Sequence, residues 1–244
     1  MTYCVAMLLK EGLVAASDSR THAGVDHIAS YRKMTTWDIP GERAIVLLSS
    51  GNLSASQAVV GFLNEGLAEA AETPPTSMLT VSSMAAAARL VGFAIREVDR
   101  HDGPALRAQG VDASVVFILG GQIKGSDMRL FQIYSAGNFI EAGPETPFFQ
   151  IGEVKYGKPI IDRVITTETH LMEAAKCALI SIDSTLKSNL SVGLPLDLAL
   201  IRRNAYEFQL RRRIEEGDPY FTNLRWRWSE GLRGVFNDIP NPNW

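Results

Sequence analysis

Residues 2–20 read TYCVAMLLKEGLVAASDSR, and this stretch decides the fold because it joins two apolar runs through a short polar turn. The runs, residues 2–9 and 13–17, flank the segment KEG at 10–12, a three-residue connection that ends in glycine and is typical of a β-hairpin. Apolar residues follow one another in both runs without alternation, which predicts strands buried on both faces. A sheet of such strands must be covered on both faces.

The remainder of the chain supplies further strands and the helices to cover them. The apolar run at 43–50 ends at Gly51, and Ser54 is placed to cap the helix that follows, while Gly120-Gly121 is expected to close another strand. The predicted strands are 2–9, 13–17, 43–50, 113–119, 128–134, 196–203 and 206–214, the predicted helices are 55–71, 77–99 and 169–189, and an irregular tail follows. Two stacked antiparallel sheets between helix layers satisfy this order. The expected fold class is therefore α+β, a four-layer αββα sandwich, although strand counts alone leave other α+β folds open.

Length and composition bound the class of protein. With 244 residues, 46% of them hydrophobic and 21% charged, the chain suits one domain spanning 1–244, with 206–244 as a C-terminal extension. A formal net charge of -3 lacks the basic bias of a nucleic-acid binder. No uncharged stretch approaches the roughly 18 residues that span a bilayer, so no membrane partner is expected. Cys4 and Cys177 lie in apolar stretches, which predicts buried free thiols and a cytoplasmic location.

The hairpin brings an acid to the beginning of the chain. Residues equidistant from the turn face each other, so Asp18 is expected opposite about Cys4, within two residues of Thr2. Removal of Met1, expected before a small residue such as threonine and the only processing expected here, leaves a hydroxyl and a free α-amine on Thr2. Such an amine titrates near ~7.7 to 8.0 and can accept the hydroxyl proton near neutral pH. The two groups together are a nucleophile with its own base.

Two further residues fit the chemistry of an N-terminal nucleophile. A lysine near the amine would lower its pKa, since like charge disfavours the protonated form, and Lys33 could supply that charge with Asp18 holding it in place. An oxyanion needs backbone N–H groups at a turn or helix start, which the turn at Gly51 offers. Each residue also has an ordinary interpretation, with Asp18 as a turn cap, Lys33 as a surface lysine and Gly51 as a turn glycine.

At these residues the sequence resembles the proteasome β-subunit family of N-terminal nucleophile hydrolases. The shared elements are Thr2 opening a strand, ASDSR at 16–20, Lys33, and SSGN at 49–52 before a helix. The order of helices and strands agrees along roughly residues 2–203. Within the family, the TYC opening, KSNLSVGLP at 187–195 and the long C-terminal extension look most like the bacterial ancestral β-subunit. The individual motifs are short, so the specificity of the resemblance comes from their joint spacing.

The resemblance implies a threonine-type peptidase or amidase that self-assembles into a ring, double ring or open spiral, without a metal or organic cofactor. Thr2 would attack the carbonyl, and its α-amine would shuttle the proton. The residues that the family pattern assigns around this pair are Lys33, Asp18, Gly51 with its N–H as oxyanion donor, and Ser191 as a helper. By the same analogy, the residues that line the substrate pocket are Thr21, Tyr31 and Ser49.

The chain departs from the family pattern at two helper positions. The turn that usually carries a helper serine reads GPETPF at 143–148, where Thr146 is the nearest substitute. In the second helper pair Ser191 is kept, but Ser188 stands where an acid is usual, and Asp183 on the preceding helix is expected to be solvated. Two other functions therefore stay open. One is a catalytically weak or inactive assembly subunit of the same fold, and the other is an N-terminal nucleophile amidase for small substrates with a closed pocket and no large oligomer.

Residues 202–234 are rich in arginine and aromatic residues, a composition that could stack on nucleic acid. Acids are interleaved through the same stretch, so a protein contact surface is favoured, with the arginines at 211–213 forming salt bridges to a neighbouring subunit. Trp226 and Phe236 are costly to leave in water on a monomer. The extension is therefore expected to mediate oligomerisation.

Overall fold

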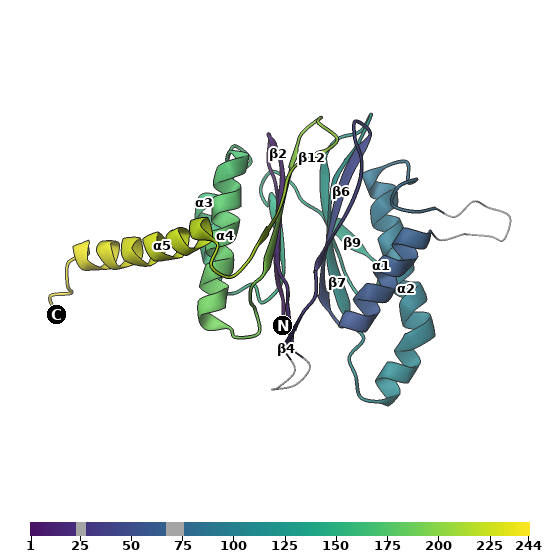
Figure 1. Cartoon of the computed structure of the whole chain (residues 1–244), viewed down its shortest axis with the longest axis horizontal. Coiled ribbons are helices and arrows are strands. Elements are labelled where there is room, and N and C mark those ends of the chain that lie inside the picture. Colours follow the sequence, from purple (N-terminus) through teal and green to yellow (C-terminus); the bar gives the residue numbers. More distant parts are fainter. Residues whose placement is uncertain (23–27, 67–75) are drawn as a thin grey trace.

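The computed structural model describes residues 1–22, 28–66 and 76–244, and its central elements are two antiparallel sheets stacked between helices (Figure 1). The opening hairpin lies within the first sheet, where β1 (Tyr3–Leu8) pairs with β2 (Gly12–Asp18). The order of this sheet is β10-β1-β2-β11-β12, completed by β10 (Phe148–Gly152), β11 (Leu196–Arg202) and β12 (Phe208–Ile214). The second sheet has the order β5-β6-β7-β8-β9 and consists of β5 (Met34–Ile39), β6 (Arg43–Gly51), β7 (Val115–Ile123), β8 (Arg129–Ile133) and β9 (Phe139–Glu141).

Helices cover the outer face of each sheet. The second sheet is covered by α1 (Leu53–Glu65) and α2 (Met84–Ala108), and the first by α3 (Lys158–Val164) and α4 (Leu171–Ser188) (Figure 1). The strands β3 (Arg20–His22) and β4 (Ile28–Ser30) pair as a separate short ribbon. The last helix, α5 (Pro219–Asp238), begins beside α4 and then projects away from the body (Figure 1). The predicted four-layer αββα sandwich is confirmed.

The opening strands are apolar on both faces because each face packs against a different layer. Alternate side chains of β1 enter the cluster under α3 and α4, whereas Cys4 and Ala6 enter the cluster between the two sheets. That inner layer also contains small side chains from facing sheets, Ala15 on β2 and Ala44 on β6. Cys4 and Cys177 are both buried and free, as predicted.

The first two helices differ from the prediction at their N-termini. Ser54 does not cap α1, because Asn52 does: its side-chain oxygen accepts a hydrogen bond from the backbone N–H of the first turn at 3.1 Å. The end of the predicted range, 67–71, lies outside the described residues. The helix predicted at 77–99 begins later, after Ser83, whose hydroxyl caps α2. It also ends later than predicted, at Ala108, and contains Pro104.

Gly120 and Gly121 do not close a strand as predicted. β7 runs through both, because the position of Gly120 faces the other sheet, where an added Cβ would lie 2.5 Å from the side chain of Leu13. The prediction also omitted β3, β4, β5, β9, β10 and α3. None of these elements exceeds seven residues, a length at which apolar periodicity identifies an element poorly.

The C-terminal segment is helical rather than irregular. Asp218 caps α5 by accepting a hydrogen bond from the N–H of Phe221 at 2.9 Å, and Pro219 occupies the start of the helix, where it costs no hydrogen bond. The three arginines predicted to bridge to a neighbouring subunit are paired inside the chain, as Arg211–Asp38, Arg212–Asp218 and Arg213–Asp197. Within the described ranges, no helix combines the length and apolar character needed to cross a membrane.

Candidate active site

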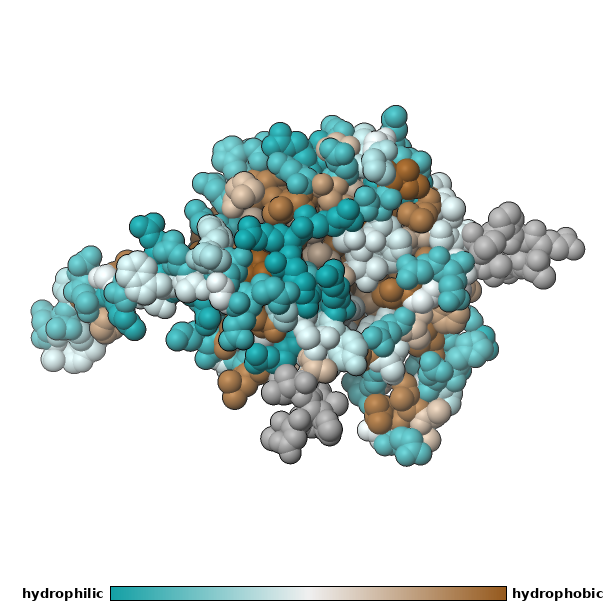
Figure 2. Space-filling view, viewed as in Figure 1, coloured by the Kyte–Doolittle hydropathy of each residue, from teal (hydrophilic) through white to brown (hydrophobic). Residues whose placement is uncertain are grey.

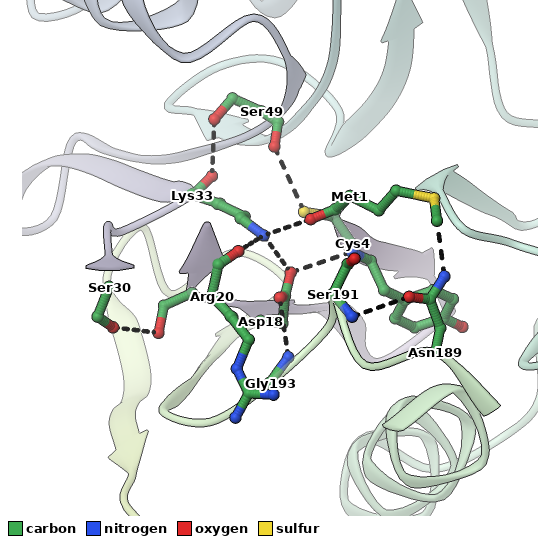
Figure 3. A network of polar contacts seen from close by, with 12 residues as sticks. Met1, Cys4, Asp18, Arg20, Ser30, Lys33, Ser49, Asn189, Ser191 and Gly193 are labelled. Atoms are coloured by element: carbon green, nitrogen blue, oxygen red, sulfur yellow. Dashed lines mark hydrogen bonds and ion pairs between the residues drawn. The ribbon is translucent and has the colours of Figure 1, made fainter. Parts of the chain in front are cut away.

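Four of the predicted site residues lie where the chain begins, and Figure 3 shows two of them, Asp18 and Lys33, beside Met1. Thr2 precedes β1, Asp18 ends β2, Lys33 immediately precedes β5, and Gly51 ends β6. A cavity of about 500 Å³ opens beside Thr2, and Lys33, Ser49 and Gly51 are among the residues that line it. Four segments that are distant in sequence thus meet around one threonine.

Asp18 is fully buried at the base of this site. Its Oδ1 accepts hydrogen bonds from Lys33 Nζ at 2.7 Å and from the N–H of Tyr3 at 3.0 Å, and its Oδ2 accepts one from the N–H of Gly193 at 3.2 Å. The pairing of Cys4 with Ser17 places Asp18 opposite Tyr3, so the predicted register is wrong by one residue. The carboxylate is held by one cation and two backbone donors, which leaves it little freedom to move.

Lys33 is buried as well, which is unusual for a lysine and excludes the ordinary surface interpretation. Its Nζ donates to Asp18 Oδ1 at 2.7 Å, to the carbonyl of Arg20 at 2.7 Å and to the carbonyl of Met1 at 3.3 Å. Three acceptors match the three N–H donors of an ammonium. The Met1 carbonyl belongs to the peptide bond that precedes Thr2, so the lysine charge lies against the backbone at the threonine nitrogen.

The charges around the terminus change the pKa of its amine in opposite directions. The chain in the structure begins at Met1, and burial lowers the pKa of the Met1 α-amine below its ordinary value; Lys33 lowers this pKa further, while Asp18 and Glu153 raise it. Burial raises the pKa of the Asp18 carboxyl, and Lys33 together with the two backbone donors opposes that effect. The amine at this place therefore loses its proton more readily than an exposed one.

Thr2 is fixed by the strand on its other side. The N–H of Glu153 donates to the Thr2 carbonyl at 2.7 Å, and β10 pairs with β1 so that Gly152 faces Tyr3. A Cβ added to Gly152 would lie 2.0 Å from the Thr2 carbonyl oxygen, and the φ of Gly152 is 86°. Only glycine permits this approach, which presses β10 against the nucleophile candidate.

Gly51 ends β6 with its backbone N–H unused by the pairing of β6 with β5. The N–H of Ser49 donates to the Lys33 carbonyl at 2.9 Å on the β5 side of β6, and the N–H of Asn52 donates to the Ser114 carbonyl at 2.9 Å on the β7 side. Because N–H groups alternate between the two edges of a strand, the Gly51 N–H points to the β5 side, beyond the end of β5. A Cβ on Gly51 would lie 2.2 Å from the Ser114 carbonyl oxygen, so this strand end also depends on glycine.

Two of the three residues predicted to line the substrate pocket do line the cavity, and the third does not. Thr21 on β3 and Ser49 on β6 line the cavity beside Thr2, and both are partly buried. Tyr31 does not line it; its side chain is exposed, and its N–H donates to the carbonyl of Ser19 at 2.8 Å.

Ser191 lies on the loop that follows α4 and is partly buried. Its N–H donates to the side-chain oxygen of Asn189 at 2.9 Å, and the same loop supplies the Gly193 N–H that binds Asp18 (Figure 3). Ser191 itself is not one of the residues that line the cavity. The contact between this loop and Asp18 is made by the backbone N–H of Gly193 and not by the hydroxyl of Ser191.

Two of the substitutes for helper residues are located elsewhere. Thr146 is exposed and precedes β10, at the end of that strand where Phe148 faces Met7, so it lies at the far end of β1 from Thr2. Asp183 is neither solvated nor near the site. It is buried on α4, where it binds Arg225 of α5 at 2.6 Å.

Sequence reasoning missed Glu153 and Asn189. Glu153 Oε2 accepts a hydrogen bond from Asn189 Nδ2 at 3.0 Å, beside the beginning of the chain. The signal available in the sequence was the apolar run FFQIG at 148–152, which ends in the glycine that Thr2 requires. Its short length left the run unassigned, and the acid that follows it was therefore not placed.

The four-layer sandwich, with a threonine at the start of a central strand above a buried aspartate–lysine pair, defines a proteasome-like chain of the N-terminal nucleophile fold. Anbu (ancestral beta-subunit) from Yersinia bercovieri is 49% identical and superposes with a TM-score of 0.91 over 100% of this chain and 99% of its own. Anbu from Hyphomicrobium sp. strain MC1 is 51% identical over 100% of both chains, with a TM-score of 0.89. The Anbu complex of Pseudomonas aeruginosa, solved as a helical assembly, is 48% identical over 99% of this chain and 98% of its own, with a TM-score of 0.92. The chain belongs to the Anbu family. No protein-family model and no curated protein matches it.

Proposed function

We propose that this chain is a threonine-type N-terminal nucleophile hydrolase that cleaves a peptide or amide bond, and that it works as a subunit of a large homo-oligomer in the cytoplasm. One observation carries the proposal. A buried lysine, held by a buried aspartate, reaches the carbonyl of the peptide bond before Thr2. A fold that only assembled would have no need of a buried ion pair at this place, because such pairs are costly to desolvate.

The proposed reaction begins with removal of Met1, which makes the Thr2 nitrogen a free α-amine. The amine takes the hydroxyl proton as Thr2 Oγ attacks the substrate carbonyl, and the Gly51 N–H stabilises the oxyanion. The amine then returns the proton to the leaving nitrogen, which leaves an ester on Thr2. A water molecule, deprotonated by the same amine, hydrolyses the ester. Lys33 keeps the amine unprotonated at neutral pH, and Asp18 orients Lys33.

The remaining predicted roles stay proposals. Thr21 and Ser49 line the cavity and are proposed to contact the substrate. Tyr31 stands outside the cavity lining and is proposed to meet only the part of a substrate that extends beyond it. Ser191 is proposed to act through its loop, by holding Gly193 against Asp18. No metal or organic cofactor enters the proposal.

The proposal is tested by mapping a covalent adduct. In the fully assembled protein that has lost Met1, verified by intact mass, a peptide epoxyketone is expected to modify Thr2, because the hydroxyl and amine act on it together. Peptide mass spectrometry locates the adduct. Absence of any adduct on Thr2 under these conditions would support the inactive assembly subunit instead. An adduct on a small, non-assembling species would support the small-substrate amidase.

Assembly is proposed to involve the C-terminal extension 206–244, above all α5. An apolar stripe at heptad-like spacing follows α5 through Phe221, Leu224, Trp228, Leu232, Val235 and Ile239. The first two residues are buried against the body, and the last three are more than half exposed. On the face drawn in Figure 2, the projecting part is mostly hydrophilic or intermediate in colour. The stripe thus continues from contacts inside the chain to a surface without a partner, which a second copy of the chain could cover.

We expect one charge on this stripe to break the assembly. Val235→Asp places a carboxylate in the proposed contact, where each fully buried apolar side chain contributes about 1.5 to 3 kcal/mol. The variant should sediment as small species. Asn237→Asp is the matched control, since it adds the same charge about half a turn away, on the opposite face of α5. Equal assembly of both variants by analytical ultracentrifugation would contradict the role of the stripe.

A further inference from the structure

A carboxylate that the proposed mechanism does not use lies beside Thr2. Glu153 follows β10, and its N–H donates to the Thr2 carbonyl at 2.7 Å, so its backbone position is fixed relative to the nucleophile candidate. The Glu153 side chain is only 10% exposed. A buried acid needs a hydrogen-bonding partner or a nearby cation, because burial of an isolated charge is costly.

The Glu153 carboxylate is held by Asn189. Asn189 Nδ2 donates to Glu153 Oε2 at 3.0 Å, and Asn189 Oδ1 accepts from the N–H of Ser191 at 2.9 Å, which fixes the orientation of the amide. Lys155 also lies near, at 3.4 Å from Glu153 Oε1, but the lysine side chain is 67% exposed. Such a solvated cation compensates a buried acid only weakly.

Met1 lies between Asn189 and Lys33 (Figure 3). The Met1 carbonyl accepts from Lys33 Nζ at 3.3 Å, while Met1 Sδ lies 3.7 Å from Asn189 Nδ2. When Met1 is removed, the new ammonium on Thr2 carries three N–H donors, and the pair of Glu153 and Asn189 borders the space that the methionine leaves. An acid in that position can accept from the ammonium.

We infer that Glu153, held by Asn189, is a positioning residue for the α-amine of Thr2, acting from the side opposite Lys33. The inference deepens the proposed function and rests on the same amine. Asp18 from β2, Lys33 from the segment before β5 and Glu153 from the segment after β10 are the charged groups that act on the neighbouring Met1 amine, and the same groups would surround the Thr2 amine once Met1 is removed. Lys33 drives the proton off the amine, whereas Glu153 retains it and orients the group. The balance between them sets the pH at which the amine can act as a base.

The test is a titration of the α-amine that needs no hydrolase activity. The full chain is released from an N-terminal fusion cleaved directly before Thr2 and is allowed to assemble. The rate of α-amine carbamylation by cyanate is measured against pH by peptide mass spectrometry. Glu153→Gln should move the midpoint down by about half to one pH unit, because a nearby acid favours the protonated amine and its removal takes that effect away. Glu145→Gln, at an exposed acid before β10, should leave the midpoint unchanged.

A variant that adds charge keeps the test decisive if Glu153→Gln fails to assemble. Asn189→Asp places a second acid beside the amine and should move the midpoint up. An unchanged midpoint in an assembled Glu153→Gln or Asn189→Asp protein would overturn the inference. The result of this titration can be distinguished from the result of the labelling experiment that tests the proposed function. A shifted midpoint with no epoxyketone adduct would support the positioning role and reject hydrolysis, and an adduct with no shift would do the reverse.

Discussion

Thr2→Ala, in a chain processed to begin at residue 2, is expected to reduce epoxyketone labelling by at least about a thousandfold. The substitution removes the attacking oxygen but keeps the α-amine, the backbone bond to Glu153 and most of the packing at a site that is 7% exposed. Assembly should therefore persist, as measured by light scattering. Thr2→Ser should retain a measurable part of the labelling, because it restores an oxygen at the same place.

Thr21→Ala is the matched control for this series. Thr21 lines the same cavity and carries the same kind of hydroxyl as Thr2. Labelling at Thr2 should survive in this variant, with a change only in the concentration of probe required. If Thr21→Ala abolished the adduct and Thr2→Ala preserved it, the nucleophile would be wrongly assigned.

Lys33→Met is expected to cost about 3 to 5 kcal/mol of unfolding free energy and to suppress labelling. Methionine fills much of the lysine volume, but Asp18 then stays buried without its cation. In the proposed mechanism the amine of Thr2 also loses its positive neighbour, because Lys33 Nζ reaches the peptide bond that precedes Thr2. Denaturant unfolding at a fixed protein concentration measures the loss, since assembly makes apparent stability depend on concentration.

The pH dependence of this loss has a definite sign. Burial raises the pKa of Asp18, and in Lys33→Met the cation that opposes this effect is gone. A group whose pKa is higher in the folded state than in the unfolded state destabilises the fold as pH rises through that value. The variant should therefore lose less stability at pH 5 than at pH 8.

The double variant Lys33→Met/Asp18→Asn separates packing from chemistry. Removal of both charges should recover much of the stability, because no unpaired charge remains. Labelling should stay lost, since the amine has no positive neighbour. Recovery of labelling in the double variant would show that the ion pair serves only the fold.

The elements that were predicted correctly are those whose local sequence pattern agrees with their packing in the fold. The hairpin at 2–20 has long apolar runs and a short turn, so its two strands and the approach of Asp18 to Thr2 follow from pairing alone. Lys33 was proposed from the chemistry of the amine and from the family resemblance, because nothing in the local sequence pattern predicts that a lysine is buried. The fold supplies the reason, as Asp18 and two carbonyls accept its three donors.

The elements that sequence missed depend on contacts that local pattern does not encode. The pairing of β10 with β1 joins segments about 145 residues apart in the sequence. It requires the absence of a side chain at Gly152, which lies against the Thr2 carbonyl, so the sequence pattern alone could not place Glu153 near Thr2. α5 was assigned to an irregular tail because its apolar stripe is narrow and much of it is exposed, without cover from the residues that the structure describes. Asp218 and Pro219, a cap followed by proline, were the available signals for that helix.

The nucleophile candidate and the proposed oxyanion donor belong to different sheets, since Thr2 precedes β1 and Gly51 ends β6. The gap between these two groups is therefore set by the thickness of the layer that separates the sheets. Ala6, Ala15 and Ala44 act there as spacers, and sheets packed face to face stand about 10 Å apart. A larger side chain at one of these alanines would increase the distance between the two sheets and so move Thr2 and Gly51 apart. A substitution in the interior can therefore change the distance between Thr2 and Gly51 although the substituted residue does not line the cavity.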